Sequence, residues 1–179
     1  KNPNAFVAAG LFLGMAGDIF LIWAEDKKRF LTGAFLFTAG HACYSYVLFT
    51  SAAASGMSVP WWGVALLALP YAAEIAVAAR CVCPHMKDAS LKPLMPVYLG
   101  VVSVVNVGAW LCFLPSLQTG RGAFGAALVV LGGVFFLVSD TILASALFKG
   151  GIKRDNFYVM LTYIAAQACL CFGFLYYLA

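Results

Sequence analysis

Six long apolar stretches, separated by short segments rich in charge, glycine or proline, constrain the fold of this chain more than any other feature. Each is about 20 residues long, the length that an α-helix needs to cross the hydrocarbon core of a bilayer. They cover residues 4–23, 30–51, 59–79, 94–114, 122–148 and 157–179. Only 10% of the residues are charged, against about 25% in a soluble domain. The pattern predicts an all-α, polytopic transmembrane helix bundle that forms one domain over residues 1–179.

Positive charges are concentrated in the segments that follow the first, third and fifth predicted helices. These segments and their margins carry Lys27, Lys28, Arg29, Arg80, Lys87, Lys92, Lys149, Lys153 and Arg154, whereas the other side has only Lys1 and Arg121. Because loops rich in Lys and Arg stay in the cytoplasm, these three loops are predicted to be cytoplasmic. The membrane is then a bacterial inner membrane or the endoplasmic reticulum. The net charge of +4 is too small and too scattered for a nucleic-acid partner.

Two aspartates lie within the predicted membrane helices. Asp18 belongs to the first helix and Asp140 to the fifth, each followed by an apolar run. A carboxyl group in hydrocarbon costs roughly 2.5–3.5 kcal/mol on insertion scales, and intramembrane acids mark functional sites by default. The two aspartates are therefore the first candidates for a functional role.

Further polar side chains are predicted at a similar depth, counted from the positively charged ends of the helices. They are His41, Glu74, Tyr98, Tyr163 and Gln167. At about 1.5 Å per residue, the whole set occupies a layer roughly 7–16 Å below that surface. This predicts a shared cavity that opens towards the cytoplasmic leaflet. Hydrogen bonds between neighbouring helices are the alternative explanation.

The first two predicted helices resemble the last two. Gly17-Asp18-Ile19-Phe20-Leu21 corresponds to Ser139-Asp140-Thr141-Ile142-Leu143 at an offset of 122 residues, and a charged loop follows each. Both pairs have the same orientation, so the match predicts a parallel pseudo-repeat about an axis along the membrane normal. If the repeat is complete, a helix precedes residue 4 as 94–114 precedes 122–148, and we expect further sequence upstream of Lys1.

Glycines share helix faces with both aspartates. Gly10 and Gly14 precede Asp18 at intervals of four, and Gly133 precedes Asp140 by seven. Glycine allows two helix backbones to approach closely, and it also leaves room for a lipid chain beside a carboxyl group. The sequence does not decide between these two uses.

The chain lacks the common signatures of catalytic and cofactor sites. It has no G-x-S-x-G, H-E-x-x-H, phosphate-binding glycine loop, haem or flavin motif. Its six cysteines do not form the paired C-x-x-C signature of a zinc site, so no metal is predicted. Two carboxyl groups that share a low-dielectric site favour one neutral and one ionised form. That pair suits protonation by an acid followed by attack of water.

Four motifs, in order along nearly the whole chain, resemble the YhhN-like family of lysoplasmalogenases. They are Gly17-Asp18-Ile19-Phe20-Leu21-Ile22-Trp23, Gly40-His41 with Tyr44, Ser139-Asp140 with Leu143-Ala144, and Tyr163 with Ala166-Gln167. The resemblance implies an eight-helix membrane fold of which this chain supplies the last six helices. It also implies hydrolysis of the vinyl-ether bond of lysoplasmalogens, lysophospholipids drawn from the bilayer, to a fatty aldehyde and glycerophosphoethanolamine or glycerophosphocholine. No cofactor is expected, and the oligomeric state is left open.

The resemblance and the depth of the side chains together assign candidate roles. Asp18 and Asp140 are the predicted catalytic pair, and either can be the acid. Residues that orient water, tune the pair or bind substrate are His41, Tyr44, Glu74, Lys92, Tyr98, Tyr163 and Gln167. Lys92, Arg80 and residues 27–29 lie at the right level for a lipid phosphate, although they equally serve to fix the topology.

Other functions fit part of the pattern. A small proton-coupled transporter also uses intramembrane acids and a parallel repeat, and helices broken by Gly or Pro in both halves would favour it. An intramembrane aspartyl protease is disfavoured because the segment before Asp18 lacks a close Gly-x-Gly-Asp pattern. A lipid sensor without catalytic activity is a further alternative.

Overall fold

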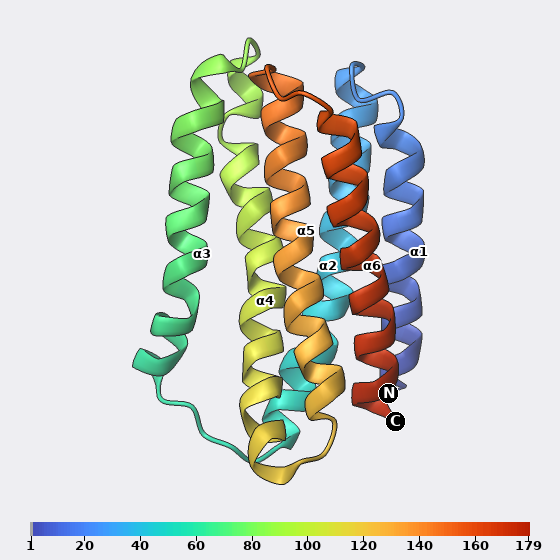
Figure 1. Cartoon of the computed structure of the whole chain (residues 1–179), viewed down its shortest axis with the longest axis vertical. Coiled ribbons are helices and arrows are strands. Elements are labelled where there is room, and N and C mark those ends of the chain that lie inside the picture. Colours follow the sequence, from blue (N-terminus) through green and yellow to red (C-terminus); the bar gives the residue numbers. More distant parts are fainter. Residues whose placement is uncertain (1) are drawn as a thin grey trace.

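Long helices account for most of the computed structural model, which describes residues 2–179 (Figure 1). The helices are α1 (Pro3–Leu21), α2 (Lys27–Ala54), α3 (Trp61–Val82), α4 (Leu94–Thr119), α5 (Ala123–Phe148) and α6 (Asp155–Leu178). Two short 3-10 helices, η1 (Cys83–His85) and η2 (Ala89–Leu91), connect α3 to α4. Within residues 2–179 there is no strand. The predicted all-α bundle of six helices is confirmed.

Five helical segments of the described chain are long and apolar enough to cross a membrane. They are Pro3–Leu21, Trp61–His85, Ala89–Thr119, Ala123–Phe148 and Asp155–Leu178. The sixth predicted span, 30–51, lies within α2, which has the length but not the apolar composition of the others. Polar side chains such as Thr38, His41 and Ser45 interrupt it. These side chains are buried or half-buried, so α2 fits the membrane region because its neighbours cover its polar groups.

The helix ends follow from local sequence. Asp26 precedes α2, and its carboxylate accepts a hydrogen bond of 2.9 Å from the backbone N–H of Arg29, which satisfies a free donor of the first turn. Pro60 and Pro93 precede α3 and α4. Helix α4 ends at Thr119, and its C-cap Gly120 has a φ of 71°, the left-handed conformation that glycine adopts without strain. Charged, proline and glycine residues therefore set the boundaries of the bundle elements.

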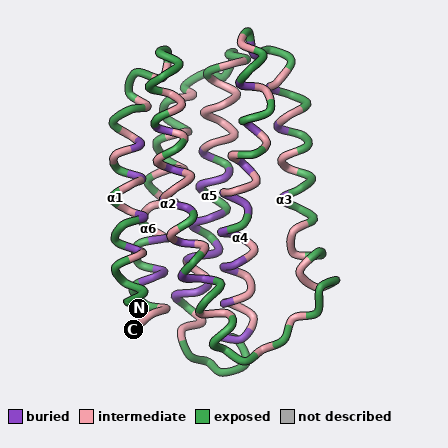
Figure 2. Tube along the Cα trace, turned by 180° about the vertical axis from the view of Figure 1, so that it is seen from behind, coloured by how far each residue is buried: buried purple, intermediate pink, exposed green. Residues whose placement is uncertain are grey.

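The helices pack as two antiparallel hairpins with α4 between them. α1 packs on α2, α5 packs on α6, and α4 contacts both α2 and α5. α3 lies outside, against α4 and α5, and Figure 1 shows it standing apart at the end opposite η1. Figure 2 shows the buried residues concentrated on α2, α4, α5 and α6, whereas most of α3 is exposed or intermediate. Most of the core is therefore formed by the inward faces of the five clustered helices, and α3 adds Tyr71, Ala78 and Val82.

The α1–α2, α3–α4 and α5–α6 connections lie together at one end of the bundle, and both termini lie near the other end (Figure 1). Lys27 Nζ and Asp88 Oδ2, 2.6 Å apart, join the first two of these connections. This end carries the nine positive residues of the three loops, whereas Arg121 is in the α4–α5 connection at the opposite end. Lys1 lies outside the described residues. That the positive end faces the cytoplasm remains a prediction.

Glycines bring the helices of each hairpin into backbone contact. A Cβ atom added at Gly40 in α2 would lie 2.9 Å from the carbonyl oxygen of Gly10 in α1. A Cβ at Gly132 in α5 would lie 3.1 Å from the carbonyl oxygen of Ala166 in α6. Gly10 and Gly132 are related by the offset of 122 residues seen in the sequence, and they face the related positions Tyr44 and Ala166 of the second helix of each hairpin. The glycines beside the aspartates serve helix packing.

Candidate active site

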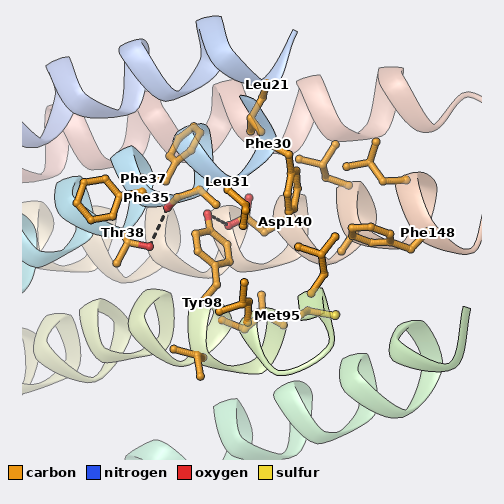
Figure 3. Close-up of a pocket in the computed structure, with 18 of the residues that line it drawn as sticks. Leu21, Phe30, Leu31, Phe35, Phe37, Thr38, Met95, Tyr98, Asp140 and Phe148 are labelled. Carbon is orange, nitrogen blue, oxygen red and sulfur yellow. Dashed lines mark hydrogen bonds between the residues drawn. The ribbon is translucent and has the colours of Figure 1, made fainter. Parts of the chain in front are cut away.

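Asp140 in α5 lines a cavity of about 340 Å³, between Thr38 on one side and Phe148 on the other (Figure 3). The hydroxyl of Tyr98 in α4 donates a hydrogen bond of 2.8 Å to Asp140 Oδ2 (Figure 3). Within the described chain, Asp140 is the only carboxyl-bearing residue of the lining, and Thr38 and Tyr98 are its only hydroxyl-bearing ones. The other lining side chains are apolar. The cavity thus presents one carboxyl group to an otherwise hydrophobic space.

The cavity lies between α2, α4 and α5, with Leu21 of α1 at its outer end. It runs from Asp140 to Phe148 along α5, which is about 12 Å at 1.5 Å per residue. Two rim residues are strongly exposed, Phe35 in α2 at 70% and Val97 in α4 at 63%. Both belong to membrane-embedded parts of the bundle, so this side of the cavity opens towards lipid.

In the half of the bundle nearer the termini, α2 and α4 contact each other closely. There, Leu48 is fully buried and its carbonyl oxygen accepts a hydrogen bond of 3.2 Å from Cys112 Sγ. An added Cβ at Gly108 would lie 3.1 Å from Leu48 Cβ. Nearer the positive end, the bulky Phe35 and the helix turn around Val97 stand on either side of the cavity instead.

Asp18 in α1 has a matching tyrosine partner from a different helix. The hydroxyl of Tyr163 in α6 donates a hydrogen bond of 2.6 Å to Asp18 Oδ2. Gln167, one turn further along α6, donates from Nε2 to the Tyr163 hydroxyl at 2.8 Å. These bonds fix the Asp18 carboxyl in the seam between α1 and α6. Each aspartate therefore accepts a hydrogen bond from a tyrosine that is distant in sequence.

The two acids are neighbours, but they do not line the same space. Asp18 lies near enough to Asp140 for their charges to interact, yet Asp18 is absent from the cavity lining. Phe37 lines the cavity and also packs against the position of Gly17 and the ring of Tyr163, whose centroid is 6.3 Å away. Of the predicted polar layer, only Asp140 and Tyr98 reach the cavity. The prediction of one shared cavity for all of these groups is wrong.

His41 and Tyr44 lie deeper in the bundle, within an aromatic cluster. His41 is buried, its ring centroid is 4.5 Å from that of Phe136, and its Nδ1 is 2.7 Å from the carbonyl oxygen of Phe37. A carbonyl only accepts, so Nδ1 carries a proton. Tyr44 packs on Phe174 with ring centroids 5.4 Å apart. Neither side chain lines the cavity, and both support the helix that carries Phe37.

Neither Glu74 nor Lys92 shares a site with the two aspartates. Glu74 in α3 lies in a second cavity and accepts a hydrogen bond of 2.5 Å from Thr141 Oγ1. The predicted depth of Glu74 along α3 fits a shared layer with the aspartates. However, α3 packs on the outer side of α4 and α5, so the Glu74 side chain lies in a different cavity from Asp140. Lys92 lies at the positive end between the lining residues Leu91 and Leu94 without lining the cavity itself.

Three residues near the aspartates had no role in the sequence-based predictions. Phe37 separates the cavity from Tyr163, Thr38 adds a hydroxyl to the lining, and Thr141 joins α5 to Glu74. Thr141 follows Asp140 directly, so its position was a usable signal. Nothing in the sequence distinguishes Phe37 from the other phenylalanines.

The fold and this site define a class of protein: a polytopic helical membrane protein with a carboxyl-bearing cavity open to lipid. The chain belongs to the YhhN family, whose family model matches residues 1–174. No curated protein and no solved structure matches the chain.

Proposed function

We propose that the protein is a lysoplasmalogenase that hydrolyses the vinyl-ether bond of a lysophospholipid taken from the bilayer. The observation that carries this proposal is the Asp140 carboxyl in the lining of an apolar, lipid-facing cavity, held by Tyr98. A single acid in a hydrophobic space suits a substrate whose reacting bond adjoins a hydrocarbon chain. Membership in the YhhN family supports the same activity.

The substrate enters between α2 and α4. Its alkenyl chain lies along the apolar lining and leaves past Phe35 and Val97 into the bilayer. Its glycerophosphate group points towards the positive end of the bundle, where Arg29, Lys87, Lys92 and Lys149 each adjoin a lining residue in sequence. This orientation places the enol-ether carbons beside Asp140. Binding of the chain needs no polar partner, because nearly all of the lining is apolar.

The reaction begins with transfer of a proton from Asp140 to the vinyl carbon that is not bonded to oxygen. The resulting oxocarbenium ion takes up water at the carbon bonded to oxygen, and this water loses a proton to the Asp140 carboxylate. The hemiacetal then collapses to the fatty aldehyde and the glycerol hydroxyl of the second product. One water is consumed and the acid is regenerated. The use of carboxyl groups around such an ion follows the logic of glycoside hydrolysis.

Tyr98 and Asp18 support this chemistry in different ways. The Tyr98 hydroxyl donates to Asp140 Oδ2, which leaves Oδ1 to carry the transferable proton, and the bond strengthens as negative charge develops on the carboxylate. Asp18 accepts from Tyr163 and does not line the cavity, so it is not the proton donor and takes the ionised role in the pair. The ionised Asp18 then stabilises the oxocarbenium ion through its charge. It does not contact this ion, because Phe37 lies between them. We therefore assign Asp140 as the acid and Asp18 as its electrostatic partner.

Hydrolysis is better supported than proton-coupled transport. A transporter site of this kind is expected where helices are interrupted beside the ion-binding groups. Helices α1 and α5 are both continuous through Asp18 and Asp140. Pro70 lies within α3, and Pro96 and Pro115 lie within α4; neither helix carries an aspartate of the pair.

Substitution of the two aspartates tests the proposal. Asp140→Asn removes the proton donor with little change in shape, and we expect no measurable aldehyde release from a lysoplasmalogen. Asp18→Asn should also lower the rate strongly, but leave a residual activity because Asp140 is still present. Glu25→Gln, in the exposed α1–α2 connection, is the matched control for loss of a carboxylate. Near-normal turnover by Asp140→Asn would refute the assignment.

A further inference from the structure

A second cavity, of about 540 Å³, lies on the other side of α5, between α3, α4 and α5. Its lining includes Leu66 and Glu74 from α3, Trp110 from α4, and Val138 and Thr141 from α5. Leu66 is 61% exposed and Val138 is 42% exposed, so this cavity also opens towards lipid. It is separate from the cavity of Asp140, because consecutive residues of α5, Asp140 and Thr141, face the two spaces.

Glu74 has one oxygen that the protein does not satisfy. Thr141 Oγ1 donates to Glu74 Oε1 at 2.5 Å. The other oxygen, Oε2, is buried and has no hydrogen-bond partner among residues 2–179. A buried acceptor without a hydrogen-bond partner destabilises the protein by about the full free energy of its desolvation. The Glu74 carboxylate is therefore only half satisfied by the protein, and because Glu74 lines the adjoining cavity, a ligand there can pair with its charge.

Aromatic side chains also line this second cavity. Trp110 Nε1 donates a hydrogen bond of 3.0 Å to the Tyr71 hydroxyl, and both residues line the cavity. This bond uses the only donor of the indole and holds the two side chains in place. A carboxylate beside aromatic rings is the arrangement with which proteins bind ammonium groups, since the charge and the ring faces both attract a cation. A neutral hydroxyl would gain only the hydrogen bond to Glu74.

We propose that this second cavity binds a single-chain amphiphile with a protonated amine, whose ammonium group pairs with the Glu74 carboxylate. The aliphatic chain lies past Leu66 and Val138 and continues into the bilayer. The site does not depend on the hydrolytic function, since it uses neither Asp140 nor Tyr98. Glu74 is thus assigned to ligand binding in its own cavity instead of to the catalytic pair.

The fluorescence of Trp110 provides a direct test, since no other tryptophan of residues 2–179 lines this cavity. In a background with Trp23, Trp61 and Trp62 replaced by Phe, the purified protein in phosphatidylcholine nanodiscs is titrated with dodecylamine or with dodecanol. We expect a saturable change with dodecylamine at lower concentration than with dodecanol. Equal responses to the two probes would overturn the preference for an amine.

Variants connect the response to the cavity. Glu74→Gln keeps the shape and the bond to Thr141 but loses the charge, so dodecylamine should bind roughly ten- to a hundredfold more weakly. Asp140→Asn should bind it as the parent does. If Glu74→Gln proves unstable, Val138→Phe narrows the cavity without touching Glu74 and should also weaken binding. Amine binding that is unchanged in both Glu74→Gln and Val138→Phe, or lost in Asp140→Asn, contradicts the proposal. Because binding is read without substrate, a failed hydrolysis assay leaves this test intact.

Discussion

Replacing Tyr98 with Phe tests how the acid is activated, because it removes one hydroxyl and leaves the ring in the cavity wall. In the resting site, Tyr98 donates to Asp140 Oδ2 at 2.8 Å. A hydrogen bond to a neutral group contributes about 0.5–1.5 kcal/mol, and one to a charged group about 1.5–3 kcal/mol. If Asp140 gives up its proton in the rate-limiting step, the bond gains the difference, about 1–1.5 kcal/mol, on the way to the transition state.

That difference corresponds to a five- to tenfold lower kcat, at about 1.4 kcal/mol for each factor of ten. KM should change little, because the hydroxyl is not required to bind the apolar chain. The assay is aldehyde release from a lysoplasmenylethanolamine in detergent micelles at saturating substrate. Tyr158→Phe, which removes an exposed hydroxyl from α6, is the matched control. A kcat for Tyr98→Phe equal to that of the control would refute the argument that Tyr98 assists proton transfer.

Three further predictions concern helix packing, the loop ion pair and the reaction path. Gly10→Ala places a methyl group into the ring of Tyr44 and should destabilise the protein by about 1–3 kcal/mol, seen as a lower melting temperature; Gly100→Ala, where nothing lies within 4 Å, should not. Mainly because Lys27 donates to it, the pKa of Asp88 is lowered to about 2, below the roughly 3.9 of the unfolded chain. The ion pair therefore contributes fully to the stability of the protein above pH ~4, and this contribution is lost as pH falls through 2. The difference in melting temperature between wild type and Asp88→Asn should accordingly stay constant from pH 5 to 8. A difference that changes within this range contradicts the lowered pKa of Asp88. In heavy water, the aldehyde should carry deuterium at its alpha carbon, and an unlabelled product would exclude protonation there.

The sequence predicted the helices well because length and apolar composition are local properties. All six predicted ranges overlap a helix, and both ends of most agree within a few residues. It also singled out Asp18 and Asp140 from the cost of burying a carboxyl group in hydrocarbon. Depth below the positive end followed directly from counting residues along each helix.

Which side chains meet across the bundle was not predictable in the same way. Tyr98 reaches Asp140 over 42 positions and Tyr163 reaches Asp18 over 145, and both pairings depend on how each helix is rotated and which helices are neighbours. Glu74 shows the consequence: its depth was appropriate, but α3 packs outside α4 and α5, so its carboxyl faces a different cavity. Residue spacing gives a position along the helix axis, whereas packing decides the direction in which a side chain points.

Incubation of the purified protein with a lysoplasmalogen and with its saturated ether analogue tests the central claim most directly. The two lipids share head group and chain, and only the first has a double bond that an acid can protonate. We expect fatty aldehyde from the lysoplasmalogen alone, with no product from the analogue. An intact lysoplasmalogen after incubation, or cleavage of both lipids, would contradict acid-catalysed hydrolysis of a vinyl ether in the Asp140 cavity.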